Sequence, residues 1–421
     1  MALGLFLVPS QNGRLAKAAA LGSMLLVLVL AVVVFQSIPS TLNPGYAYIT
    51  RIRWIDDLGI SYYLGVDRLS ALLILITTLV GVTAIAVTPL VKHANYFYGL
   101  GLLMIGGMAG AFASLDLFFF YIFHELALIP TFLLIGIWGG KKRKLAAIKI
   151  TLYLGLASLV VLFGFIGLYL AAGGRTFDLV VLRQQLEMGK IILPTTQIQL
   201  FGLLLLGFGT LIAIVPFHTW APMGYGEAPP FAAMLHAGVI KNFGLYGLIR
   251  IAIPLLPEGF AYWQHTMVWL AVLNLMYGGY VAMQQKDLCY MLAYASVSHM
   301  GYALLALASG TVIALQGFML FLFAHGLSVA LGFAVAGYFV KQMGTAEVQA
   351  MGGLAKRMPL AATIFTMVAL AGFGFPGFAS FPAELMIFFG SFDVFRWATI
   401  LAIWTTVISA IYFLRAVGTC L

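Results

Sequence analysis

The chain has 421 residues, of which 63% are hydrophobic and 8% are charged, and its mean hydropathy is +1.05. In soluble domains roughly a quarter of the residues are charged, so this composition excludes a soluble globular protein. The formal net charge of +9 comes from Lys and Arg residues in short segments between apolar stretches, which indicates a membrane protein rather than one that binds nucleic acid.

Twelve apolar stretches have about the 20 residues that a helix needs to cross a bilayer. None shows the alternation of apolar and polar residues that a membrane β-barrel requires. We therefore expect an all-α polytopic membrane protein. The predicted spans are residues 17–38, 68–90, 97–114, 116–138, 146–172, 198–220, 228–253, 264–283, 288–309, 313–340, 359–391 and 397–418.

The first nine residues are apolar but too short to span and lack the features of a signal peptide, so they resemble the tail of a truncated helix. Alternating the loops between the two sides gathers most unbalanced positive charge on one side, which the positive-inside rule makes cytoplasmic. That side carries Arg14, Lys17, Lys92, Lys141, Lys142, Arg143, Lys144, Lys286, Lys341, Lys356 and Arg357.

Two of the spans contain clusters of helix breakers. The sixth ends in Pro216-Phe217-His218-Thr219-Trp220-Ala221-Pro222, and the eleventh contains Gly372-Phe373-Gly374-Phe375-Pro376-Gly377-Phe378. Each break falls in the fourth span of a set of five, which favours two inverted five-helix repeats around an ion path. We expect N-terminal helices at 1–92, a first unit at 97–256 and a second at 262–418.

Glu125 lies about nine residues into a span, roughly 14 Å deep. A carboxylate at that depth is unfavourable unless it is paired, protonated or in a wet cavity, so it is a candidate proton carrier; a protonated structural acid is the alternative. Its neighbour His124 points about 100° away and is expected to pack or cap.

Two lysines are further candidates. Lys241 lies deep in the seventh span, where a lysine can hold or release a proton according to the position of a carboxylate partner, and where snorkelling is unfavourable. Lys149 lies one turn inside the fifth span and could either act there or reach the cytoplasmic loop.

His299 and His325 lie near the centres of the ninth and tenth spans beside small or hydroxyl-bearing residues. Imidazole titrates near physiological pH, so two histidines at matched depth favour a proton relay over structural histidines. Glu384 follows the second helix break and is the corresponding acid. Only Cys289 and Cys420 are present, and the histidines have no metal-ligand spacing, so we expect no metal or cofactor on this chain.

Several segments together resemble the antiporter-like membrane subunits of respiratory complex I, and within them the M-type subunits of NADH-quinone oxidoreductase. The matching segments are Phe120 to Pro130, Ala146 to Lys149, Val215 to Pro222, Tyr246 to Arg250, Ser298 to Gly301, Ala324 to Ser328 and Met351 to Leu354. The resemblance implies two inverted five-helix units and a redox-coupled proton path. It assigns Glu125 as the first acid, Lys149 as a modulating charge, His299 and His325 as the central relay, and Glu384 as the terminal group.

The sequence departs from this family at three places. Leu211 stands where the family has a lysine, Lys241 is displaced by one residue from the family position at Asn242, and about 12 spans are present where the family has about 14. The alternatives are a subunit of a multisubunit cation/proton antiporter or membrane hydrogenase, or a structural subunit whose pumping is lost.

The resemblance also implies partners and location. It implies L-, N- and K-type membrane subunits beside this chain, with flavin, iron–sulfur clusters and quinone on partner subunits. The chain would lie as a multi-pass protein in the inner membrane, or in the thylakoid membrane of a photosynthetic organism.

Overall fold

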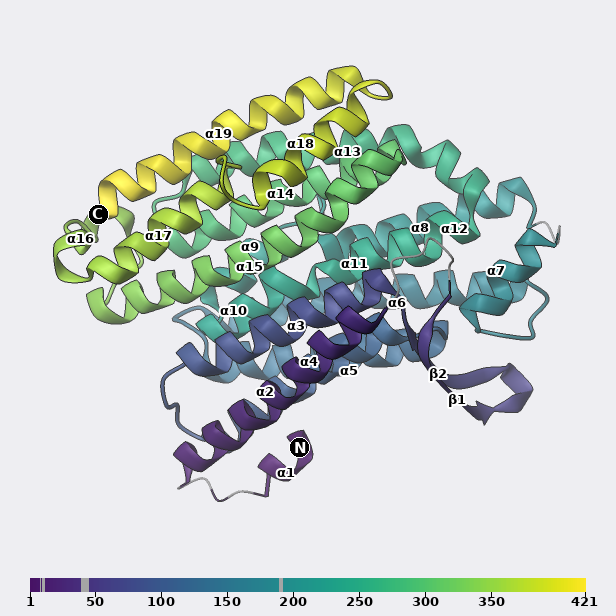
Figure 1. Ribbon diagram of the computed structural model, residues 1–421, viewed down its shortest axis with the longest axis horizontal. Helices are drawn as coiled ribbons and strands as arrows, with labels where there is room; N and C mark the ends of the chain where they lie inside the picture. The colour runs from purple at the N-terminus through teal and green to yellow at the C-terminus, as the bar shows by residue number, and fades with distance from the viewer. Residues whose placement is uncertain (8, 10–11, 39–44, 189–191) are drawn as a thin grey trace. The chain divides into compact units, whose positions relative to one another are not determined.

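The computed structural model covers residues 1–421 and describes all of them except 8, 10–11, 39–44 and 189–191. Within this described part, eleven helices are long and apolar enough to cross a membrane (Figure 1). A helix satisfies its own backbone hydrogen bonds, which is why a lipid-embedded chain adopts it. The eleven are α2 (Gly13–Ser37), α3 (Arg68–Val87), α4 (Ala94–Ala113), α5 (Leu117–Trp138), α6 (Arg143–Ala171), α8 (Pro194–Ile212), the composite helix Pro230–Leu255, α13 (Pro257–Gln284), α14 (Leu288–Ser309), α15 (Val312–Met343) and α19 (Arg396–Cys420).

The eleventh predicted span, 359–391, is present as two shorter helices, α17 (Pro359–Gly372) and α18 (Ser380–Phe392). The prediction of an all-α polytopic membrane fold is confirmed. Four further helices are too short to span: α1 (Ala2–Leu5), α7 (Leu179–Glu187), α9 (Trp220–Glu227) and α16 (Leu354–Arg357).

The first predicted break separates α8 from α9. Pro216 has no backbone N–H to donate, and Ala213 has a left-handed backbone with φ 67°. The buried side chain of Asn274 on α13 replaces the lost helical hydrogen bonds: it accepts one from the Val215 N–H at 2.6 Å and donates one to the Ala213 carbonyl at 3.3 Å. The irregular backbone therefore survives in the protein interior because a polar side chain completes it.

The second predicted break separates α17 from α18. Gly374 and Gly377 both have positive φ angles, at 69° and 107°, which residues with a Cβ rarely adopt. The hydroxyl of Ser380, the first residue of α18, donates to the Ala371 carbonyl at 2.6 Å and so completes the end of α17. Both breaks are thus fixed by specific polar contacts.

A β-hairpin that the sequence reading did not predict follows α2. Strands β1 (Ala47–Ile55) and β2 (Ile60–Val66) are antiparallel, with Arg51 opposite Tyr63. Gly59 in the turn has φ +65°, and a Cβ there would clash with the Arg175 carbonyl. Only glycine therefore allows this turn to approach the loop before α7.

Two buried aspartates anchor this hairpin to helix ends in the same unit. Asp116 accepts hydrogen bonds from the N–H groups of Phe118 and Phe119, at the start of α5, and from the N–H of Ser61 in β2. Burial raises the pKa of Asp116 to about 6, although these backbone hydrogen bonds lower it. Asp178 caps α7 and forms an ion pair with Arg51 of β1 at 2.8 Å.

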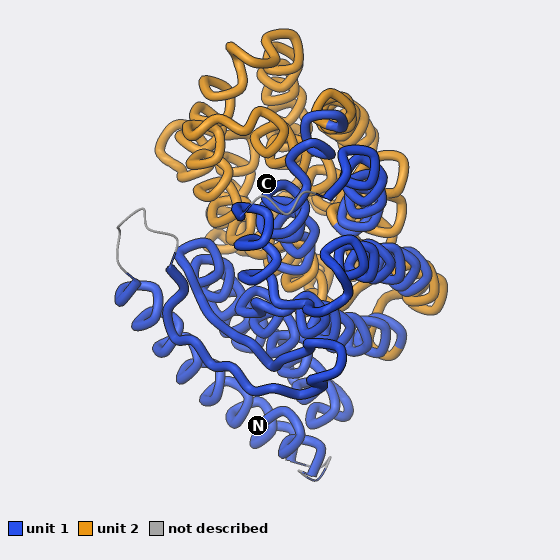
Figure 2. The backbone as a smooth tube through the Cα atoms, turned by 90° about the vertical axis from the view of Figure 1, so that its right-hand side faces the viewer, with its two compact units in different colours: residues 1–136, 151–211, 239–263 blue, residues 137–150, 212–238, 264–421 orange. Residues whose placement is uncertain are grey.

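The described residues divide into two compact units, each assembled from segments that are separate in the sequence (Figure 2). Unit 1 consists of Met1–Gly136, Thr151–Leu211 and Val239–Trp263, and unit 2 of Ile137–Ile150, Ile212–Gly238 and Gln264–Leu421. The division into inverted repeats at 97–256 and 262–418 concerns internal symmetry and stays a prediction.

We predict that Arg51→Ala lowers the stability of the chain more than Arg53→Ala does. Arg51 neutralises Asp178, which is 1% exposed, whereas Arg53 is exposed on the same strand. Because Arg51 is itself half-exposed, we expect a loss of about 1 kcal/mol rather than the larger loss of a buried pair. Thermal unfolding of the detergent-purified chain measures this, and equal melting temperatures for the two variants would contradict it.

Candidate functional site

The two histidines that the sequence singles out lie in contact with each other in unit 2. His299 on α14 and His325 on α15 are both buried, and their ring centroids lie 5.3 Å apart at an angle of 81°. The Ser296 hydroxyl lies 3.3 Å from Nε2 of His325. Two imidazoles and a hydroxyl at this spacing can exchange a proton directly or through one water molecule.

A small cavity adjoins the two histidines. It has a volume of about 20 Å³ and is lined by both rings, by Ser296 and Ser328, and by Gly372 at the end of α17. A site needs roughly 10–15 Å³ and several polar partners to hold a water molecule. The cavity meets both conditions, so the histidines border a space for water beside the second helix break.

Glu384 lies on α18, one turn after the break, and its side chain is buried with 5% exposure. Gly374 in the break packs directly against the Glu384 carboxyl group, so that a Cβ at position 374 would clash with it. Tyr302 and Tyr412 lie within electrostatic range of the same carboxyl group. The break therefore leaves room for a buried acid.

Glu125 differs from the expectation of a fully buried acid. It lies on α5 in unit 1, and its side chain is 31% exposed. Its neighbour His124 takes the buried position, with its ring 5.2 Å from Phe243 and Nδ1 3.9 Å from the Glu125 carboxyl group. The expectation that His124 packs is confirmed. Tyr121, one turn earlier, interacts with both Glu125 and Ser158 of α6.

Lys241 is fully buried in unit 1, which excludes snorkelling. It follows a π-helical turn, His236–Ile240, and a second π-helical turn, Leu248–Ala252, comes after α11 (Asn242–Gly247). Each π turn accommodates one residue more than an α-helical turn and often marks a functional site. Leu211, which replaces the family lysine, is buried near the end of α8.

Lys149 lies in unit 2 and is partly exposed near the start of α6. This position is compatible with both readings from the sequence, a charge beside the path and a side chain that reaches the loop. Its role stays a prediction.

Sequence reasoning missed three buried groups in unit 2. His218, in the first break, lies 5.0 Å from the Tyr277 ring, and His236, in the first π turn, lies 5.9 Å from the Tyr225 ring. Tyr302 is the third. Its spacing of three residues from His299 on one helix was the available signal.

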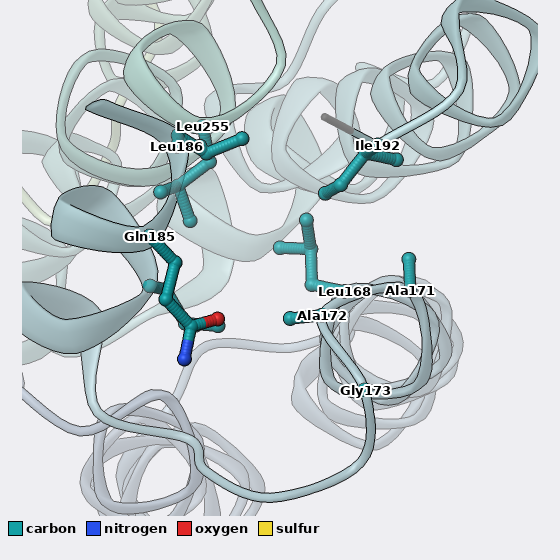
Figure 3. A pocket seen from close by; sticks show the side chains of 9 residues that line it. Leu168, Ala171, Ala172, Gly173, Gln185, Leu186, Ile192 and Leu255 are labelled. Carbon is teal, nitrogen blue, oxygen red and sulfur yellow. The ribbon is translucent and has the colours of Figure 1, made fainter. Parts of the chain in front are cut away.

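A larger cavity of about 360 Å³ in unit 1 contains none of the predicted residues (Figure 3). Gln185 is the polar side chain among the described residues that line it, and none of those described residues is titratable. In the described part of the chain, no group of three His, Cys, Asp or Glu residues is placed to hold a metal ion.

Comparisons with known proteins identify relatives of this chain. The family pattern described as NADH:quinone oxidoreductase/Mrp antiporter, TM, matches residues 114–409. NAD(P)H-quinone oxidoreductase chain 4 2 of Microcystis aeruginosa is 36% identical over 393 residues, covering 92% of this chain and 70% of that protein.

Two solved structures share the fold. A chain of respiratory complex I from Thermus thermophilus with bound NADH has a TM-score of 0.89 and 32% identity, covering 100% of this chain and 88% of that one. A chain of the Mrp complex from Dietzia sp. DQ12-45-1b has a TM-score of 0.86, with 99% and 77% covered, but at 23% identity it shows the fold alone.

We predict that Gly374→Ala impairs the site more than Gly377→Ala does. Both glycines have a left-handed backbone, where an alanine adds about 1 kcal/mol of strain or more. A new Cβ at position 374 also pushes against the Glu384 carboxyl group, whereas position 377 has nothing within 4 Å.

The infrared carbonyl band of protonated Glu384 measures the displacement of this carboxyl group. The band is identified by its absence in Glu384→Gln. We expect a shifted band in Gly374→Ala and an unchanged band in Gly377→Ala. The same shift in both variants would mean that backbone strain, not the contact, positions the acid.

Proposed function

The chain belongs to the NADH:quinone oxidoreductase/Mrp antiporter family, and from this premise we propose that it is a proton-translocating membrane subunit of an NAD(P)H-quinone oxidoreductase. The relative at 36% identity and the complex I chain at 32% identity both support this assignment. The chain itself carries out no electron transfer in this proposal. Redox energy released on partner subunits drives proton movement through its buried residues.

The observation that carries the proposal is the buried set His325, His299 and Glu384 in unit 2. Ionisable side chains are rare inside membrane proteins because desolvation penalises the charged form, so they mark ion pathways when they occur together. Here two imidazoles are in contact, and the acid lies beside the helix break that adjoins their cavity. This arrangement can accept a proton at the histidines and release it through the acid.

In unit 1, the proposed path is regulated by two ionisable residues. Glu125 is the acid and Lys241 the buried cation, so a proton lost or gained by one changes the electrostatic field at the other. In this proposal Lys149 is a modulating charge. Leu211 contributes no charge in place of the family lysine, so Lys241 takes on that role.

Partners and cofactors follow from the proposed function. The related proteins are components of multisubunit complexes, and we propose that L-, N- and K-type membrane subunits flank this chain. Flavin, iron–sulfur clusters and quinone would be bound by other subunits. The spans support a multi-pass protein of the inner membrane or the thylakoid membrane.

A subunit of a multisubunit cation/proton antiporter is the second candidate, favoured by the shared fold of the Mrp complex. The third is a structural subunit without pumping, favoured by the buried Leu211. Affinity purification of the tagged chain from its own membranes separates the first two. Flavin and iron–sulfur spectra in the purified complex support the oxidoreductase, and their absence together with Na⁺/H⁺ exchange supports the antiporter.

We predict that Glu384→Gln and Glu125→Gln each reduce redox-driven proton uptake into sealed vesicles several-fold while the complex still assembles. Glutamine keeps the size and hydrogen bonding of the side chain but cannot carry a proton. Glu258→Gln is the matched control, because Glu258 is exposed at the start of α13. Wild-type numbers of protons per electron in both path variants would favour the structural subunit.

A further inference from the structure

The proposed path has a gap between the histidine pair and Glu384, and one side chain lies across it. Tyr302 is on α14, three residues after His299, so the two side chains share a helix face. It is 1% exposed. The phenol is therefore held deep in unit 2, on the side of α14 that faces the other members of the path.

The ring of Tyr302 packs beside His299 and beside an aromatic ring on α18, the helix that carries Glu384. Its centroid lies 6.1 Å from the His299 ring and 5.8 Å from the ring of Phe388, which follows Glu384 by one turn on α18. It also lies 6.1 Å from Phe321, the ring that stacks on His325. Side chains of α14, α15 and α18 thus surround the ring, and α18 also carries Glu384.

The hydroxyl of Tyr302 has a partner that can exchange protons. It donates to the Ala402 carbonyl at 3.3 Å and lies 3.2 Å from the Thr406 hydroxyl, both on α19. It is also within electrostatic range of the Glu384 carboxyl group. A phenol can donate and accept at the same oxygen, which is the requirement for a relay group.

We propose that the Tyr302 hydroxyl is the relay between His299 and Glu384, an inference that rests on the proposed function. The phenol oxygen receives one proton from the protonated imidazole of His299, directly or through a water molecule. Its own proton leaves toward the Glu384 carboxylate as the O–H bond turns about the C–O bond, away from the Ala402 carbonyl. The imidazolium becomes neutral imidazole, the carboxylate becomes a carboxylic acid, and the phenol ends as it began.

Tyr412 provides a matched control. It is fully buried on α19 and also lies within electrostatic range of Glu384. Its hydroxyl, however, donates to Ser409 on its own helix at 3.2 Å, and its ring lies 4.8 Å from that of the neighbouring Phe413. A tyrosine near the acid whose hydroxyl is hydrogen-bonded within its own helix should not relay.

The test uses the complete complex in sealed vesicles with Tyr302→Phe, Tyr412→Phe and Glu384→Gln. We expect Tyr302→Phe to reduce the protons moved per electron several-fold, with no further loss in the double variant Tyr302→Phe/Glu384→Gln. We expect Tyr412→Phe to remain near wild type. The infrared band of protonated Glu384 should lose its redox-linked change in Tyr302→Phe only.

Other outcomes separate the two proposals. Wild-type stoichiometry in Tyr302→Phe beside a large loss in Glu384→Gln overturns the relay and leaves the pumping function intact. Wild-type stoichiometry in Glu384→Gln overturns the pumping function. Equal losses in both tyrosine variants also overturn the relay, because they indicate a general need for polar groups near the acid. If Tyr302→Phe fails to assemble, Tyr302→Gln keeps a hydrogen-bonding side chain that does not relay a proton as a phenol does, and an unchanged infrared response of Glu384 in that variant overturns the proposal.

Discussion

The structure depends on one constraint, that a polar group inside the membrane must find its partner within the protein. Asn274 shows how strictly this holds, since one amide side chain completes the backbone on both sides of residue 214. Ser380 does the same for the second break. Once the backbone is completed in this way, the chain can open its helices at two points and place polar side chains there without exposing loose N–H or C=O groups to lipid.

The same constraint explains the contrast between the two acids. Glu384 is buried because the second break, with glycine at position 374, leaves space for its carboxyl group among aromatic side chains. Glu125 lies on an uninterrupted helix and remains partly exposed, while His124 occupies the buried face. An acid on an intact helix takes its surroundings from other elements alone, whereas the break gives Glu384 space within its own span.

Much of this could be predicted from the sequence. Spans are readable because hydropathy accumulates over about 20 residues, and the breaks because Pro and Gly cluster there. The histidine pair was predictable from matched depth. The hairpin was not predictable, because Arg51 and Arg53 in β1 resemble charged residues of a loop. The hairpin is stabilised by Asp178, which is distant in the sequence. The exposure of Glu125 and the contacts of Tyr302 depend on how each helix is rotated, which depth along the sequence does not specify.

In the span that carries Lys241, two π turns set the rotation of the helix. A π turn holds one extra residue, so everything after it is rotated by about 100° relative to a plain α-helix of the same sequence. In the span Pro230–Leu255, the π turns thus change the direction in which side chains point around the helix axis, and they leave the depth of the span unchanged. The deletion of a single residue within 236–240 could be absorbed by an ordinary helical turn, with both helix ends kept in place. Insertions and deletions usually disrupt a membrane helix. Here a change of one residue turns the side chain of Lys241, which is one position away from its expected place, toward a new neighbour.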